Sequence, residues 1–143
     1  MTKTVLAAID LIHKDLHGDI LGKAAKFAEL DDARLVVVTV IPDFGMSIVG
    51  TYFDEDAEKK ALTQAATDLH SAVTEQLGES EDKQIKHVVC HGNAYEEILE
   101  TADKFDVNLI VMGAHAPKIR DYLLGPNAAR VVRHSTCSVF VVR

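Results

Sequence analysis

Cysteine is scarce in this chain of 143 residues, and long apolar runs are absent. Cys90 and Cys137 form no C-x-x-C pair, so a reducing compartment fits better than a disulfide framework. The longest apolar runs, residues 35–41 and 109–112, fall far short of the roughly 18 residues that a membrane-spanning helix needs. No signal peptide is visible. We therefore expect a cytoplasmic protein that does not insert into a membrane.

Basic residues are also in the minority, with 15 Lys and Arg against 22 Asp and Glu. The net charge of −7 repels phosphate polymers, so we expect no nucleic-acid partner. Residues 114–143, however, hold five bases against one acid, Asp121. The five bases are Lys118, Arg120, Arg130, Arg133 and Arg143. This basic segment could bind a small anion.

The eight glycines form neither G-x-G-x-x-G nor G-x-x-x-x-G-K-[ST]. The dinucleotide-binding fingerprint and the Walker A loop are therefore both missing. Dehydrogenases and P-loop enzymes are excluded as classes.

Apolar residues make up 48% of the chain, which is enough for one hydrophobic core in a single domain spanning residues 1–143. Short β-branched runs predict five strands, at residues 4–9, 35–41, 85–91, 107–112 and 138–142. Helical spacing predicts helices between them, at residues 16–28, 62–77, 94–105 and 127–133. Asn93 is the expected N-cap of the third helix, with Glu96 in the capping-box position.

Alternating strands and helices indicate an α/β fold, a doubly wound sheet of five parallel strands with helices on both faces. Right-handed crossovers give the strand order 3-2-1-4-5 most simply. This order predicts a crevice at the carboxyl ends of the first and fourth strands, where the winding direction reverses. Asp10 and Gly113 follow these two strands, so we expect them to meet there.

Gly113 and Gly125 bracket a loop that opens directly into a helix. Glycine lets the backbone approach a ligand closely. The first amides of the helix are unpaired and lie at the positive end of its dipole, where phosphate binds well. An ordinary strand-to-helix loop with a glycine at each turn would have the same spacing. The sequence therefore leaves open whether this loop binds phosphate or only connects the two elements.

Three segments resemble the universal stress proteins over the whole chain: V-M-G at residues 111–113, L-L-G at residues 123–125, and the final R-H-S-T-C-S-V-F-V-V-R at residues 133–143. The loop is most similar to the F/G-type branch of that family. The resemblance implies an adenine-nucleotide alpha hydrolase-like fold. It also implies a dimeric stress-response module that binds ATP, AMP or ADP, with Mg²⁺ as a possible companion of the phosphates.

The resemblance also implies roles for particular residues. Asp10 would face the adenosine, the backbone of Val40 would meet the adenine edge, and Gly113 would lie near the ribose. The loop of the F/G-type branch also carries a histidine, His115 here, which would contact the nucleotide as well. The positions that cradle the phosphates correspond to Ala116, Gly125, Pro126 and Asn127.

The loop departs from the family signature, G-x2-G-x9-G-[ST], at three points. Ala116 replaces the second glycine, eight residues rather than nine follow it, and Pro126 replaces the final Ser or Thr. Proline suits the first helical position but has neither an N–H nor a hydroxyl. We predict weaker phosphate binding than the full signature provides, with the adenosine contacts retained. Asn127, Lys118, Arg120 and Arg130 are candidate substitutes for the lost donors.

Other reactive side chains carry weaker signals. His87 and His91 should share one face of the third strand while Cys90 points to the other, so without a further ligand we expect no zinc site. Cys137 is expected to be a small buried hydrophobe rather than a nucleophile. His115 is the one histidine worth testing for function, the alternative being a hydrogen-bonded loop residue.

Two segments concern partners. Residues 42–53 form a connection unusually rich in apolar side chains, which would cover the adenine pocket, a subunit interface or simply part of the sheet. Residues 138–142 should form an edge strand whose apolar edge needs cover. Pairing of two copies across a two-fold axis would provide it, and the family resemblance implies the same homodimer.

Three functions follow from these features. The first is a regulatory module whose bound nucleotide alters its contacts with a partner protein. The second is a slow ATPase or an autophosphorylating phosphotransferase, for which only Asp10, Asp121 and His115 are available beside the loop. The third is a dimerising interaction protein that no longer binds nucleotide. The sequence assigns no catalytic residue.

Overall fold

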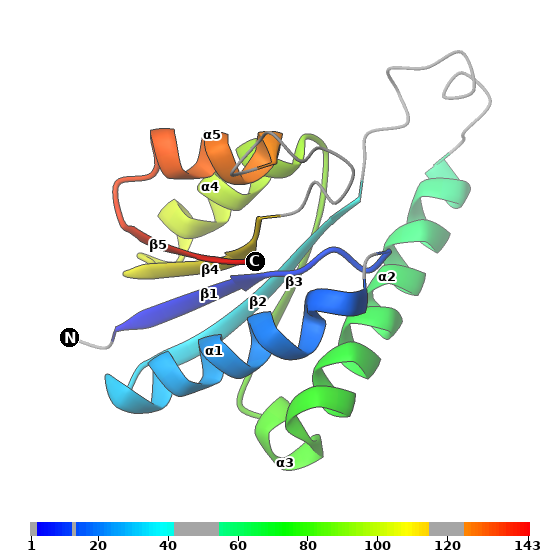
Figure 1. Ribbon diagram of the computed structural model, residues 1–143. Helices are drawn as coiled ribbons and strands as arrows, with labels where there is room; N and C mark the ends of the chain where they lie inside the picture. Colours follow the sequence, from blue (N-terminus) through cyan, green and yellow to red (C-terminus); the bar gives the residue numbers. More distant parts are fainter. Residues whose placement is uncertain (1–2, 13, 42–54, 115–124) are drawn as a thin grey trace.

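The computed structural model describes residues 3–12, 14–41, 55–114 and 125–143. Its centre is a five-stranded sheet in the order β3-β2-β1-β4-β5, with every neighbouring pair parallel (Figure 1). The strands are β1 (Thr4–Ala8), β2 (Arg34–Ile41), β3 (Lys86–His91), β4 (Leu109–Gly113) and β5 (Ser138–Val142). The predicted fold class and strand order are confirmed.

Helices cover both faces of this sheet (Figure 1). They are α1 (His17–Leu30), α2 (Glu55–Leu77), α3 (Glu79–Asp82), α4 (Ala94–Lys104) and α5 (Pro126–His134), with a short 3₁₀ turn, η1 (Lys14–Leu16), ahead of α1. The sequence did not predict η1 and α3, because neither is long enough to show a helical period.

Side chains alternate across β1 and separate two apolar clusters. Val5 and Ala7 point toward α1 and α2, and pack with Leu21 of α1 and Leu69 of α2. Leu6 and Ala8 point the other way, into a cluster that includes buried residues of α4 and α5. All five residues of β1 are buried, as expected for the central strand of a sheet covered on both faces.

The helix starts were predicted with mixed success. Asn93 is the N-cap residue of α4 and has an extended backbone, but its side chain makes no capping hydrogen bond, so the predicted capping box is wrong. The Glu96 carboxylate instead accepts a hydrogen bond from the Tyr95 hydroxyl at 3.3 Å. Pro126 is the first residue of α5, after Gly125 as N-cap. This position suits proline, which has no N–H to leave unpaired.

Candidate functional site

A pocket of about 540 Å³ lies at the carboxyl ends of β1, β2 and β4. Asp10, Val40, Gly113 and Asn127 all line it. Asp10 and Gly113 meet because β1 and β4 are paired neighbours, with Ala8 opposite Met112 in the register. The structure therefore brings together residues that lie a hundred positions apart in the sequence, as the strand order predicted.

Hydrogen bonds from Ile12 and His17 help to position Asp10, which lines the pocket. Its carboxylate Oδ1 accepts the backbone N–H of Ile12 at 3.0 Å. Its backbone carbonyl lies 2.6 Å from Nε2 of His17, a buried side chain at the start of α1. A carbonyl can only accept, so Nε2 of His17 carries the hydrogen. His17 was not predicted, because no sequence motif includes it.

One side of the pocket is formed by α2. Its contributions are the small side chains of Ala61 and Ala65 and the polar ones of Gln64 and Asp68. The amide Nε2 of Gln64 donates to the Asp68 carboxylate at 2.9 Å. Small side chains leave room for a flat ring, and a few polar groups among apolar ones are typical of a small-molecule site. These residues were not predicted, because nothing in the sequence shows which side chains of α2 face the carboxyl ends of the strands.

Gly113 forms part of the pocket floor, where space is tight. A Cβ atom added there would lie 2.8 Å from Cδ1 of Leu16 and 3.3 Å from Cδ1 of Ile20. Leu16 and Ile20 line the same pocket. A side chain at position 113 would therefore displace the ends of these two side chains and change the shape of the pocket.

Two helices begin beside the pocket, and their charges differ. The first turn of α4 carries Glu96 and Glu97, whereas the first turn of α5 carries no acidic residue. Burial raises the pKa of the Glu97 carboxyl, and the neighbouring carboxylates of Glu100 and Glu96 raise it further. An anion near α4 would add to this repulsion. The N-terminus of α5 is therefore the better place for a phosphate.

The start of α5 lies at the pocket. Asn127 and Ala128 line it, whereas Gly125 and Pro126 do not. Pro126 has no N–H, so the unpaired amides of this first turn begin at Asn127. The Arg130 guanidinium lies 5.0 Å from the centre of the Tyr95 ring, in cation–π contact. Arg130 is not among the residues that line the pocket.

Several predicted residues lie outside the part of the chain that the structure describes. They include the loop positions His115 and Ala116 and the apolar connection at residues 42–53. Lys118, Arg120 and Asp121 also lie outside the described residues.

The side chains of β3 point as predicted. Cys90 faces α4, with its Sγ 3.6 Å from the Thr101 hydroxyl. His91 faces α2, with its Nδ1 3.2 Å from the Glu58 carboxylate. His87 lies on the same face as His91. Cys137 is half-buried beside the Ser135 hydroxyl, at 3.2 Å.

None of the helices in the described ranges has the length and apolar character needed to cross a lipid bilayer.

A doubly wound parallel sheet with a pocket at its switch point defines a class of α/β folds that bind ligands at the carboxyl ends of their strands. The model of the universal stress protein family matches residues 1–143, and the chain belongs to that family.

Known relatives cover the chain throughout. It is 27% identical over 150 residues to Universal stress protein G of Salmonella typhimurium, covering 100% of both chains. The structure of universal stress protein UspA from Lactobacillus plantarum has a TM-score of 0.72 at 20% identity, covering 99% of this chain and 97% of the other. The Archaeoglobus fulgidus universal stress protein, solved in complex with dAMP, has a TM-score of 0.61 at 20% identity, covering 100% and 98%.

Proposed function

We propose that this protein is a regulatory module that binds an adenine nucleotide between Asp10, Val40, Gly113 and the N-terminus of α5. The observation that carries the proposal is the pocket that these elements share. Its volume of about 540 Å³ is in the range of small-molecule sites. The Archaeoglobus relative with the same fold was solved with dAMP, which makes an adenine nucleotide the first ligand to test.

The pocket offers each part of a nucleotide a suitable surface. Val40 and the small side chains of α2 leave an apolar slot for the adenine ring. The Asp10 carboxylate is suited to accept hydrogen bonds from ribose hydroxyls. The amides of Asn127 and Ala128 would receive the phosphate. ATP, ADP and AMP share this chemistry, and Mg²⁺ would accompany the polyphosphates.

The departure from the family signature at Pro126 gives the first testable prediction. Pro126→Ser restores an N–H and a hydroxyl at the first position of α5, and each hydrogen bond to a charged group is worth about 1.5–3 kcal/mol. We expect the variant to bind ATP about tenfold more tightly, with no change for adenosine. Calorimetry of adenosine, AMP, ADP and ATP with both proteins measures this.

The same titrations, together with an assay of ATP turnover, separate the three candidate functions. Binding of adenosine and AMP without turnover over hours supports the regulatory module, whereas product formation from ATP supports the slow ATPase. Absence of binding to all four ligands contradicts the proposal and leaves the dimerising interaction protein. ATP binding far more tightly than adenosine, with no gain from Pro126→Ser, contradicts the assigned role of position 126.

The dimer is a second part of the proposal, because β5 is an edge strand. The Val142 carbonyl accepts the N–H of Ala114 at 2.7 Å and so points toward the β4 side. Backbone groups alternate along a strand, so those of Val139 and Val141 point to the open edge. Two copies pairing through this edge across a two-fold axis would satisfy them.

Val141→Pro tests this pairing. Proline removes one outward N–H and leaves the groups that bind β4 in place, so we expect the dimer to dissociate while the domain stays folded. Val141→Thr is the matched control, because it keeps the N–H and the β-branch. Light scattering gives the mass of each protein. A dimer of unchanged affinity in Val141→Pro would contradict pairing through β5.

We place this module in the cytoplasm, where it would act on a protein partner that has yet to be identified. Cys90 and Cys137 are free thiols, as suits a reducing compartment.

A further inference from the structure

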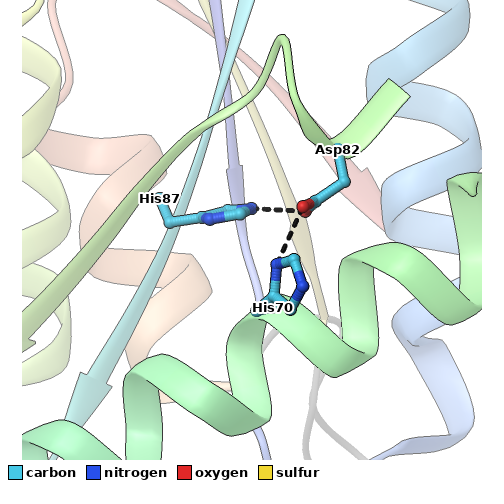
Figure 2. A group of neighbouring side chains, drawn as sticks. All are labelled: His70, Asp82 and His87. Atoms are coloured by element: carbon cyan, nitrogen blue, oxygen red, sulfur yellow. Dashed lines mark ion pairs between the residues drawn. The ribbon is translucent and has the colours of Figure 1, made fainter. Parts of the chain in front are cut away.

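Three side chains meet beneath α2, near the amino end of β3 and away from the nucleotide pocket. Figure 2 shows His70 of α2 and His87 of β3 converging on Asp82 of α3. Nδ1 of His70 lies 2.8 Å from Oδ2 of Asp82, and Nε2 of His87 lies 2.7 Å from Oδ1. The three possible ligand atoms all lie within 4.8 Å of one another. Each residue therefore directs one donor atom at a common point.

Asp82 is unusual because a carboxylate is rarely buried without a cation. Its exposed fraction is 6%, and its ion-pair partners in the described part of the chain are both histidines. Histidine is a cation only when protonated. A carboxylate between two neutral imidazoles would keep an uncompensated negative charge in a place shielded from water.

The contact between Asp82 and His87 is also unsatisfied. Oδ1 of Asp82 and Nε2 of His87 are both buried, and within the described ranges neither atom has a hydrogen-bond partner. Since the two atoms are only 2.7 Å apart, their alignment rather than their distance falls short of a hydrogen bond. Two buried polar atoms that face each other in this way would both be satisfied by a cation placed beside them.

We propose that His70, Asp82 and His87 bind a divalent transition-metal ion, of which Zn²⁺ is the best fit. Two imidazoles and one carboxylate are a common set of three protein ligands for zinc, with a fourth position left for water. Imidazole nitrogen favours zinc and its neighbours in the first transition series over Mg²⁺ and Ca²⁺, which prefer oxygen. The proposal does not depend on nucleotide binding.

The cluster needs only a small adjustment to hold the ion. Zinc lies about 2.0–2.2 Å from nitrogen and carboxylate oxygen, so two ligand atoms in a tetrahedral site are about 3.3 Å apart. The pairs at 2.7 and 2.8 Å must therefore open by about half an ångström. His70 can supply this movement, since 57% of its side chain is exposed. Its exposure also gives the ion a path from solvent.

An ion at this position would add a further link between three elements of the fold, β3, α2 and α3. His87 belongs to β3, which lies at the opposite edge of the sheet from β5. His70 belongs to the second half of α2, and Asp82 follows the turn at Gly78, whose φ of +90° suits glycine. A bound ion would thus fasten α2 and α3 to the edge strand. We expect Zn²⁺ to raise the melting temperature, because it binds the folded state.

Titration of the full-length, tag-free protein with ZnCl₂ tests the proposal. We expect one ion per chain by calorimetry, and a visible Co²⁺ spectrum from the same site. His70→Ala and Asp82→Asn should each weaken Zn²⁺ binding by at least about tenfold, since loss of an outer-shell partner alone has that effect. They should also abolish the increase in melting temperature. His70 is exposed enough for His70→Ala to fold if the buried Asp82→Asn does not.

His134→Ala is the matched control, because His134 lies in α5, on the other face of the sheet, and stacks on Tyr95. It should bind Zn²⁺ like the original chain. Equal Zn²⁺ affinity in the original chain and all three variants would mean that other surface groups bind the ion, and would overturn the proposal. Absence of saturable binding to the original chain would also overturn it, and would leave the cluster as a set of ion pairs around Asp82.

Discussion

Gly113→Val should weaken AMP binding by about 10- to 100-fold. The new Cβ would lie 2.8 Å from Cδ1 of Leu16 and 3.3 Å from Cδ1 of Ile20. Forcing extra methyl groups into a packed site costs about 1–3 kcal/mol, and about 1.4 kcal/mol corresponds to a tenfold change in affinity. The side chains that must move are themselves part of the pocket, so their displacement changes the shape of the ligand site. Calorimetry with AMP measures the loss.

Gly22→Val is the matched control, because a Cβ at Gly22 would meet nothing within 4 Å. It should leave AMP binding unchanged. Circular dichroism of both variants checks that the fold is intact. If Gly113→Val is folded and binds AMP as tightly as the original chain, the ligand does not occupy the floor between β4 and α1, and the proposed orientation fails.

Leu21→Ala should lower the free energy of unfolding by about 2–5 kcal/mol. Leu21 is 0% exposed and packs from α1 into the cluster that includes Val5 and Leu69. Alanine forms helices at least as well as leucine, so the loss comes from the cavity and not from the backbone. Since whole domains are stable by only about 5–15 kcal/mol, this is a large fraction. Urea denaturation followed by circular dichroism gives the value.

Leu30 provides the comparison within the same helix. It is 79% exposed at the last residue of α1, so Leu30→Ala should change the stability by no more than about 0.5 kcal/mol. A similar decrease in the free energy of unfolding for the two variants would contradict the packing of Leu21 of α1 against the sheet.

Much of the fold follows from short patterns in the chain. The observed strands begin and end within about two residues of their predicted bounds. Their bounds are predictable because a buried parallel strand is a nearly continuous apolar run. The strand order follows from the right-handedness of crossovers, and this order by itself predicts that Asp10 lies beside Gly113. The missing capping hydrogen bond of Asn93 shows where this reasoning ends, since a cap depends on the direction of one side chain.

Contacts between elements were harder to foresee. His17 supports Asp10, and Gln64 and Asp68 border the pocket, although no spacing in the sequence connects them. No zinc site was expected at His87 and His91 without a further ligand. The further ligands, His70 and Asp82, come from two helices and reach His87 only when α2 crosses the sheet and the chain turns at Gly78.

The amino-acid sequence alone was enough to establish the α/β class, the parallel order and the two strand ends that border the pocket. Periodicity and handedness are local properties of the backbone, so they can be recognised without coordinates. The tertiary structure decided which polar side chains face one another. Those contacts depend on how helices rotate and cross over the sheet, and packing between distant segments sets that geometry.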